Sequence, residues 1–311
     1  FYENEIKKNL EESKNVLITA FTGSGKTLPA EEAIRYYKSI GSKSIYCSPV
    51  KALTNEKYDS FRKKFPDISF GIFTGDNKDN PEADCLLMTT EILANNLNRN
   101  NIDKQENILD FKMDYANELG VVIFDEFQYL FSDRGSAWND VVVNLPKSVP
   151  IVALSATMSS PENVCKWLSR VTERDTFLCP NYKRVVPLEH YAFVTINNHG
   201  NIKKMESKDK IFVEDLIEKP LLLKNDDGFN EQTPNDIIRF KKILKNSSIY
   251  MKKQYVLNEI AKFMKQHNDL PAIVFTYSRN GCYKDAASIN TSLFEKDSQI
   301  PHIITKECKT I

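Results

Sequence analysis

The chain has 311 residues, a length that suggests about two domains at roughly 150 residues each. Hydrophobic residues make up 41% and charged residues 27% of the sequence, which excludes the composition of a disordered chain. The 42 basic and 42 acidic residues cancel, so any affinity for nucleic acid must come from local placement of charge.

The sequence contains neither the long apolar run of a membrane span nor the apolar core of a signal peptide. Its cysteines form no CxxC pair, and its histidines show no spacing typical of metal ligands. We therefore expect an intracellular protein of the cytoplasm or nucleus, with reduced cysteines and no membrane segment.

Short apolar runs alternate with amphipathic stretches over the first 180 residues. Successive β-branched or aliphatic residues are typical of strands buried on both faces, and these runs are 15–19, 44–47, 85–88, 121–124 and 150–154. Helices are expected between them, at 28–38 and 91–98, and a further helix starts at Pro161 with Ser160 as its cap. This alternation predicts an α/β fold with a parallel sheet and right-handed crossovers.

Two polar segments interrupt the pattern. The first part of 95–117 is predicted to be an exposed insertion, and 198–245 a charged, extended or partly mobile insertion. Farther on, a helix around residues 256–264 and a strand over Ala272–Phe275 are expected to begin a second α/β unit. We therefore expect a first domain over 1–180 and a second over 181–311.

The segment Ala20–Thr27, AFTGSGKT, has the composition and context of a phosphate-binding loop between a strand and a helix. The loop glycines allow backbone N–H groups to surround phosphate oxygens, aided by the positive end of the following helix. Lys26 would reach the β- and γ-phosphates, and the Thr27 hydroxyl would hold Mg²⁺. The candidate ATP-binding residues are Thr22, Gly23, Ser24, Gly25, Lys26 and Thr27.

Two further motifs follow apolar strands at their carboxyl ends, where parallel sheets bind ligands. In Asp125-Glu126-Phe127-Gln128, Asp125 would hold Mg²⁺ and Glu126 would deprotonate the attacking water. Ser155 and Thr157 follow the next apolar strand and could hydrogen-bond this carboxylate loop. Taken alone, the two acids also fit a capped strand end with solvated side chains.

These motifs, in this order, resemble motifs I, II and III of superfamily 2 helicases. A longer series of matches is similar to the Ski-like, exosome-associated DExH-box RNA helicases. The matching stretches are SPVKALTNEKY at 48–58, TGD at 74–76, NPEADCLLMTTEIL at 80–93, DRG at 133–135 with Trp138, RVVPLE at 184–189 and VFTYSR at 274–279.

The resemblance implies a first RecA-like domain with helices on both faces of its sheet, followed by an incomplete second RecA-like domain. It also implies ATP and Mg²⁺ as cofactors and ATP-driven movement on or unwinding of RNA, 3′ to 5′, within an RNA-processing complex. The residues implied to contact the sugar–phosphate backbone of a single strand are Pro49, Lys51, Thr74, Gly75, Thr89 and Thr90.

The chain departs from the family pattern at three points. Phe1-Tyr2 stands where the family has Phe-Gln near the adenine, so adenine specificity through that glutamine is not expected. Gln128 stands where the family has histidine, so histidine-linked pH dependence is not expected. The motif QxxGRxGR is absent from the sequence, so the transition-state arginine is expected from further chain, and unwinding by these residues alone is not expected. A DNA helicase and an ATP-binding assembly subunit that does not unwind are the alternative functions; intact Lys26, Asp125 and Glu126 argue against the second.

Overall fold

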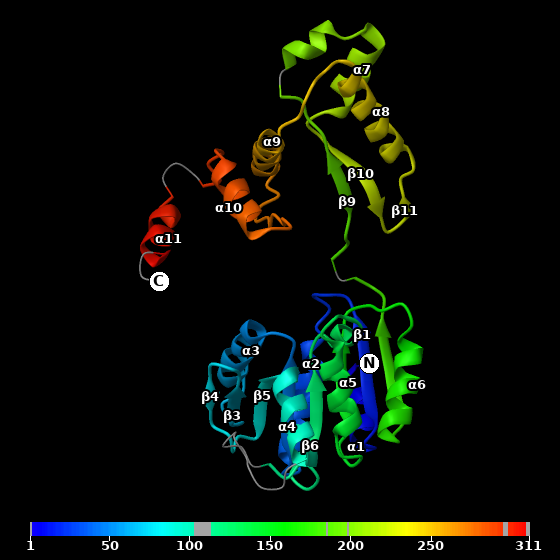
Figure 1. Cartoon of the computed structure of the whole chain (residues 1–311), viewed down its shortest axis with the longest axis vertical. Coiled ribbons are helices and arrows are strands. Elements are labelled where there is room, and N and C mark those ends of the chain that lie inside the picture. The colour runs from blue at the N-terminus through cyan, green and yellow to red at the C-terminus, as the bar shows by residue number, and fades with distance from the viewer. Residues whose placement is uncertain (1, 103–112, 185, 198, 295–297, 309–311) are drawn as a thin grey trace. The chain divides into compact units, whose positions relative to one another are not determined.

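The computed structural model describes residues 2–102, 113–184, 186–197, 199–294 and 298–308. The chain divides into two compact units, Phe1–Val185 and Val186–Ile311. Figure 1 shows the elements of both units, coloured from the N-terminus to the C-terminus.

An eight-stranded sheet forms the centre of the first unit, in the order β4-β3-β5-β2-β6-β7-β1-β8. The neighbouring strands are parallel except for the β3–β4 pair. The strands are β1 Asn15–Ala20, β2 Lys43–Ser48, β3 Phe70–Phe73, β4 Lys78–Asp79, β5 Cys85–Thr89, β6 Leu119–Phe124, β7 Ile151–Ser155 and β8 Thr176–Asn181. Each of the five apolar runs predicted from the sequence lies in a strand of this sheet, apart from one end residue, Pro150.

Helices cover both faces of the sheet, which explains why the strands are apolar on successive positions. One hydrophobic cluster includes Val122 and Phe124, and the other includes Val121 and Ile123, the alternate residues of the same strand. The helices of the unit are α1 Tyr2–Glu11, α2 Thr27–Ser39, α3 Lys51–Lys64, α4 Thr90–Ile102, α5 Gly135–Asn144 and α6 Pro161–Thr172, with a 3₁₀-helix η1 at Phe127–Phe131.

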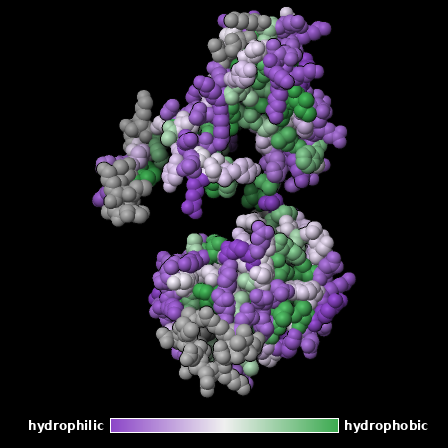
Figure 2. All heavy atoms as spheres, viewed as in Figure 1, coloured by the Kyte–Doolittle hydropathy of each residue, from purple (hydrophilic) through white to green (hydrophobic). Residues whose placement is uncertain are grey.

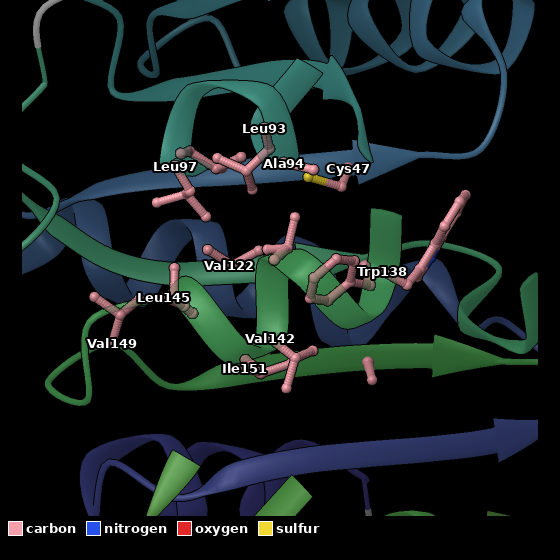
Figure 3. Close-up of a cluster of buried hydrophobic side chains, with 14 of the residues drawn as sticks. Cys47, Leu93, Ala94, Leu97, Val122, Trp138, Val142, Leu145, Val149 and Ile151 are labelled. Carbon is pink, nitrogen blue, oxygen red and sulfur yellow. The ribbon is translucent and has the colours of Figure 1, made fainter. Parts of the chain in front are cut away.

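The helices divide evenly between the two faces. Side chains of α4, α5 and α6 pack in the cluster drawn in part in Figure 3, where Leu93, Trp138 and Val142 converge. Side chains of α1, α2 and α3 pack in the other cluster. Hydrophilic side chains cover much of the visible surface of the unit (Figure 2). Because β1, β2, β5, β6 and β7 run parallel, their carboxyl ends meet at one edge of the buried sheet.

Two local expectations were wrong in this unit. The first part of 95–117 is not an exposed insertion, because α4 continues to Ile102 and Leu97 is buried in the same hydrophobic cluster as Leu93. Residues 103–112 lie outside the described residues, and Met113 after them is buried. Ser160 does not cap α6 through its side chain, although Pro161 occupies the first turn as predicted.

The second unit contains a three-stranded antiparallel sheet in the order β11-β10-β9. Its strands are β9 His190–Phe193, β10 Pro220–Asn225 and β11 Gly228–Phe229. Its helices are η2 His199–Lys204, α7 Ser207–Leu216, α8 Gln232–Asn246, α9 Lys253–Gln266, α10 Arg279–Ser288 and α11 Ile300–Cys308. Across the ranges described in both units, no helix is long and apolar enough to span a membrane.

Two expectations fail in the second unit. The segment 198–245, apart from residue 198, which is not described, is folded rather than extended, because Val213, Phe240 and Leu244 from α7 and α8 share a hydrophobic core. Residues 272–275 form no strand, and Ile273 and Phe275 are 81% and 89% exposed. A strand needs a neighbour to satisfy its backbone, and among the described residues no strand pairs with this segment.

Candidate active site

The loop between β1 and α2 has the backbone conformation that a phosphate-binding loop requires. Gly23 and Gly25 have φ angles of +83° and +79°, in the left-handed region that glycine adopts without strain. A Cβ added at either position would meet no atom within 4 Å, so the backbone angle and not the space demands glycine. The Ser24 backbone N–H donates to the carbonyl of Phe21 at 3.2 Å, which closes the loop.

The Lys26 ammonium is buried under this loop without a hydrogen-bond partner among the described residues. A small cavity of about 100 Å³ adjoins it, lined by Ile18, Ala20, Ser24, Gly25, Lys26, Leu28 and Pro29. Helix α2 begins at Thr27 with no side-chain cap, so the positive end of the helix faces the same loop. An unpaired cation beside a helix N-terminus fits a bound phosphate group.

Asp125 lies directly after β6 and is held by two donors. The Tyr46 hydroxyl donates to Oδ2 at 2.7 Å, and the Glu126 backbone N–H donates to Oδ1 at 3.0 Å. Burial raises the pKa of Asp125 above its ordinary value, and the hydrogen bond from Tyr46 opposes that rise. The pKa of Tyr46 is raised well above its ordinary value by burial and by the adjacent carboxylate. This arrangement positions a half-buried carboxylate that a cation would stabilise.

The side-chain amide of Gln128 joins the carboxylate loop to the strand after it. Its nitrogen donates to Glu126 Oε2, and its oxygen accepts from Ser155 Oγ at 3.0 Å and from the Ala156 backbone N–H at 2.9 Å. Glu126 has a φ of +51°, a conformation that costs a non-glycine residue about 1–2 kcal/mol. Thr157 is exposed and lies outside this network.

Thr27 has a neighbour that the sequence did not identify. Lys57 Nζ, from α3, lies 3.3 Å from Thr27 Oγ1, and its charge partly opposes the rise that burial causes in the pKa of Asp125. Among the described residues no three His, Cys, Asp or Glu side chains cluster as metal ligands. One carboxylate and one hydroxyl fit Mg²⁺, which keeps several waters and takes phosphate oxygens as ligands. Lys57 lies within the matched stretch 48–58, and that position was the only signal available.

Four of the residues expected to contact a nucleic-acid strand follow β2 and β3: Pro49, Lys51, Thr74 and Gly75. Lys51 Nζ is 2.7 Å from Asp76 Oδ2, and a Cβ added to Gly75 would lie 2.9 Å from the same ammonium. Thr74 Oγ1 accepts from the Asn77 backbone N–H at 3.1 Å, which forms a tight turn. Pro49 is buried at the start of the loop that leads to α3. The structure thus brings Lys51 and Gly75 together, with the lysine already paired.

Thr89 and Thr90 lie where β5 meets α4. Thr90 is fully buried, and its hydroxyl has no hydrogen-bond partner among the described residues. A contact between the nucleic-acid strand and this position would therefore use the backbone at the start of α4 and not the Thr90 side chain.

An aromatic–cation pair also lies beside the phosphate loop. Asn181, the last residue of β8, is in register with Ala20, and the Arg184 guanidinium lies 4.0 Å from the centre of the Phe21 ring. Arg184 belongs to the matched stretch 184–189, but its contact with Phe21 was not predictable from the sequence.

Comparisons with known proteins identify the family. Superkiller complex protein 2 of Mus musculus is 31% identical over 99% of this chain and 24% of its own length. Exosome RNA helicase MTR4 of Mus musculus is 30% identical over 96% of this chain and 26% of its own length. Antiviral helicase SKI2 of Saccharomyces cerevisiae is 37% identical over 60% of this chain and 14% of its own length.

The chain therefore spans about a quarter or less of the length of these relatives. The model of the DEAD/DEAH box helicase family matches residues 3–164, more than half of the chain. This range contains the phosphate loop, both carboxylates, the Gln128 network and the loops after β2, β3 and β5. The chain belongs to the DEAD/DEAH box helicase family.

Proposed function

We propose that this chain is the ATP-binding part of an RNA-dependent helicase or translocase that moves 3′ to 5′ on RNA. The observation that carries the proposal is the buried, unpaired Lys26 ammonium under a loop of left-handed glycines. It is supported by the position of Asp125 and Glu126 at the end of β6, on the same edge of the sheet.

The residues of the first unit fit Mg²⁺ and ATP. Thr27 and Asp125 would hold the metal, and Lys26 would pair with the phosphates. Bound Mg²⁺ would neutralise negative charge on the transferred phosphate. Lys57 would have to move or share Thr27 when the metal binds, because its ammonium already contacts that hydroxyl.

Glu126 is proposed to accept the proton of the attacking water. Gln128 donates to Glu126 Oε2, which restricts the carboxylate while its acceptor capacity remains available. Because an amide does not titrate, Gln128 holds Glu126 and Ser155 together at every working pH. We propose that this network couples changes in the bound nucleotide to β7, the β-strand that ends at Ser155.

A single strand of nucleic acid is proposed to bind across the loops after β2, β3 and β5. Its contacts would come from Pro49, Lys51, Thr74, Gly75, Thr89 and Thr90. Contacts of this kind reach the sugar–phosphate backbone and carry no base sequence, so binding would be sequence-tolerant and salt-dependent. RNA is favoured over DNA because two of the relatives are named as RNA helicases, MTR4 of Mus musculus and DExH9 of Arabidopsis thaliana. An RNA-processing complex of the cytoplasm or nucleus is the proposed setting.

The test compares RNA and DNA oligonucleotides of the same sequence as stimulators of ATP hydrolysis. RNA is expected to raise the rate more than DNA, and Lys26→Ala is expected to remove hydrolysis with either. Equal stimulation by DNA would favour a DNA helicase of the same superfamily. Nucleotide binding without any binding of RNA or DNA would favour an assembly subunit that uses ATP as a structural switch.

A further inference from the structure

The segment Asp133-Arg134-Gly135 connects the carboxylate loop to α5 through a turn with little freedom. A Cβ added to Gly135 would lie 2.0 Å from the carbonyl oxygen of Leu130, so only glycine fits. The Gly135 backbone N–H donates to the carbonyl of Ser132 at 2.9 Å, and the Arg134 N–H donates to the Ser132 hydroxyl at 3.2 Å. The backbone at Arg134 is therefore fixed relative to η1.

The helices on either side of this turn are fixed as well. The Trp138 ring is fully buried and stacks on Tyr129 with ring centres 5.8 Å apart and planes at 19°. Tyr129 belongs to η1, which begins directly after Glu126, and Trp138 belongs to α5. A short, packed path thus connects the carboxylate loop to Arg134.

The Arg134 side chain reaches two loops that are proposed to bind the strand. Its Nη2 donates to the Pro49 carbonyl at 2.7 Å, and its Nε donates to Glu91 Oε1 at 3.0 Å. The same Nη2 also contacts Glu91 Oε1. Pro49 precedes α3, and Glu91 lies in the first turn of α4. One guanidinium therefore joins the loop after β2, the start of α4 and the segment that follows the carboxylates.

This geometry requires arginine. A guanidinium presents several donors in one plane and can bind a carboxylate and a carbonyl at once, whereas the ammonium of lysine is a single point. The side chains of Arg134 and Glu91 are 47% and 35% exposed, so the ion pair alone adds little stability. Positioning of the two loops is the more important consequence of the contacts.

We propose that Arg134 is a positioning residue that couples the carboxylate loop to the strand-binding loops. This inference rests on the proposed function, since it assigns a role in RNA binding to the loops at Pro49 and Glu91. A shift of Glu126 or Gln128 on nucleotide binding moves η1, and Arg134 transmits that shift to both loops. Because such coupling is reciprocal, RNA bound at the loops also changes nucleotide affinity.

The experiment measures binding of a fluorescein-labelled 12-nucleotide poly-U RNA to the full chain, with and without Mg²⁺ and a non-hydrolysable ATP analogue. Arg134→Ala is expected to weaken RNA binding by about 3- to 10-fold, the loss of a charge-assisted pair and its carbonyl contact. It is also expected to bring the effect of the analogue on RNA affinity close to none. Arg134→Lys should recover only part of either effect, because it cannot bind both loops.

Arg35→Ala is the matched control, because Arg35 forms a comparably exposed ion pair with Glu32 on α2. It should leave RNA affinity and the nucleotide effect unchanged. Hydrogen exchange of the RNA-free chain gives a second readout: Arg134→Ala should speed exchange of the amides in 50–54 and 90–94, and Arg35→Ala should not.

The outcomes separate the two hypotheses. If the unaltered chain binds no RNA, the proposed function fails and this inference fails with it. If the unaltered chain binds RNA with a nucleotide effect that Arg134→Ala leaves intact, only the coupling role is wrong. Equal losses for Arg134→Ala, Arg134→Lys and Arg35→Ala would also overturn it, since they would indicate a general loss of folding.

Discussion

The loops after β1 and β6 (the nucleotide loops) and the loops after β2, β3 and β5 (the strand loops, where the nucleic-acid strand is proposed to bind) lie at the same edge of one sheet. The two sets of loops differ in how their positively charged side chains are paired. The ammonium of Lys26 is buried and has no hydrogen-bond partner among the described residues. Lys51 is exposed and already paired with Asp76. The first set of loops therefore gains an interaction when an anion arrives, whereas the second set exchanges one partner for another.

This difference predicts two kinds of binding. An unpaired buried ammonium is costly without a counter-charge, so a phosphate bound there is stabilised strongly. An exposed ion pair contributes only about 0–1 kcal/mol and is screened by salt, so a strand that replaces it gains little at each contact. We therefore expect single substitutions at the nucleotide loops to have large effects on nucleotide binding or hydrolysis. Single substitutions at the strand loops should have small, additive effects on RNA binding.

The largest expected effect is on hydrolysis. Glu126→Gln should slow the single-turnover release of phosphate by about 10²- to 10⁴-fold, because the general base is removed. Asp125 remains in place to hold Mg²⁺, so affinity for a fluorescent ATP analogue should change little. A loss of nucleotide binding as large as that of Lys26→Ala would contradict the separation of these roles.

Lys26→Ala should have the next largest effect. Loss of a hydrogen-bonded charge on the phosphates costs about 1.5–3 kcal/mol, or roughly 10- to 100-fold in affinity for a fluorescent ATP analogue. Lys38→Ala is the matched control, because this lysine lies on α2, the helix that follows Lys26, but pairs with Asp84. Equal affinities for the two variants would mean that the phosphate loop is misassigned and that the comparison of paired and unpaired cations fails.

Tyr46→Phe should shift the pH dependence of Mg²⁺ binding. Burial holds the pKa of Asp125 above its ordinary value in the folded protein, so protonation of this carboxyl competes with Mg²⁺ as the pH falls. The Tyr46 hydroxyl opposes that rise, so its removal should raise the pKa further and move the loss of Mg²⁺ binding to higher pH.

The same substitution also affects stability with a defined sign. Because the folded pKa of Asp125 lies above the unfolded value, the ionised carboxylate costs stability at high pH, and the cost disappears as the pH falls through the folded pKa. Tyr46→Phe should enlarge that cost by about 0.5–1.5 kcal/mol at neutral pH, seen by urea unfolding. Tyr58→Phe, which removes a hydroxyl from Asp79, is the matched control and should leave Mg²⁺ binding unaltered.

The smallest expected effect is at the strand loops. Asp76→Asn should strengthen binding of poly-U RNA by less than about 1 kcal/mol, because Lys51 no longer has to leave a carboxylate. Glu82→Gln, which also removes an exposed ion-paired acid, serves as its control. Weaker RNA binding by Asp76→Asn would indicate that the pair positions Lys51 for the strand and does not compete with it.

Five strands of the central sheet, β1, β2, β5, β6 and β7, were predictable because they are buried on both faces and therefore largely apolar. The strands β3, β4 and β8 were not predicted: β4 is two exposed polar residues, and β8 is mostly half-buried. The loops at the ends of β1 and β6 could be predicted to lie close together, because parallel strands bring their carboxyl ends to one edge of the sheet. Contacts between side chains distant in sequence were not predictable, as with Tyr46 on Asp125 or Arg184 on Phe21. The fold of 198–245 was missed because charged residues hide the spacing of Val213, Leu216, Phe240 and Leu244.

The division of β6 between two hydrophobic clusters has a consequence for changes in chain length. Alternate residues of this strand face opposite layers of helices, and Asp125 and Glu126 follow directly after it. Insertion or deletion of one residue within β6 would exchange the two layers' side chains and rotate the carboxylates away from the phosphate loop. Natural variation in length should therefore fall in the connections at the opposite edge of the sheet, such as Lys14 before β1 and Gly41–Ser42 before β2.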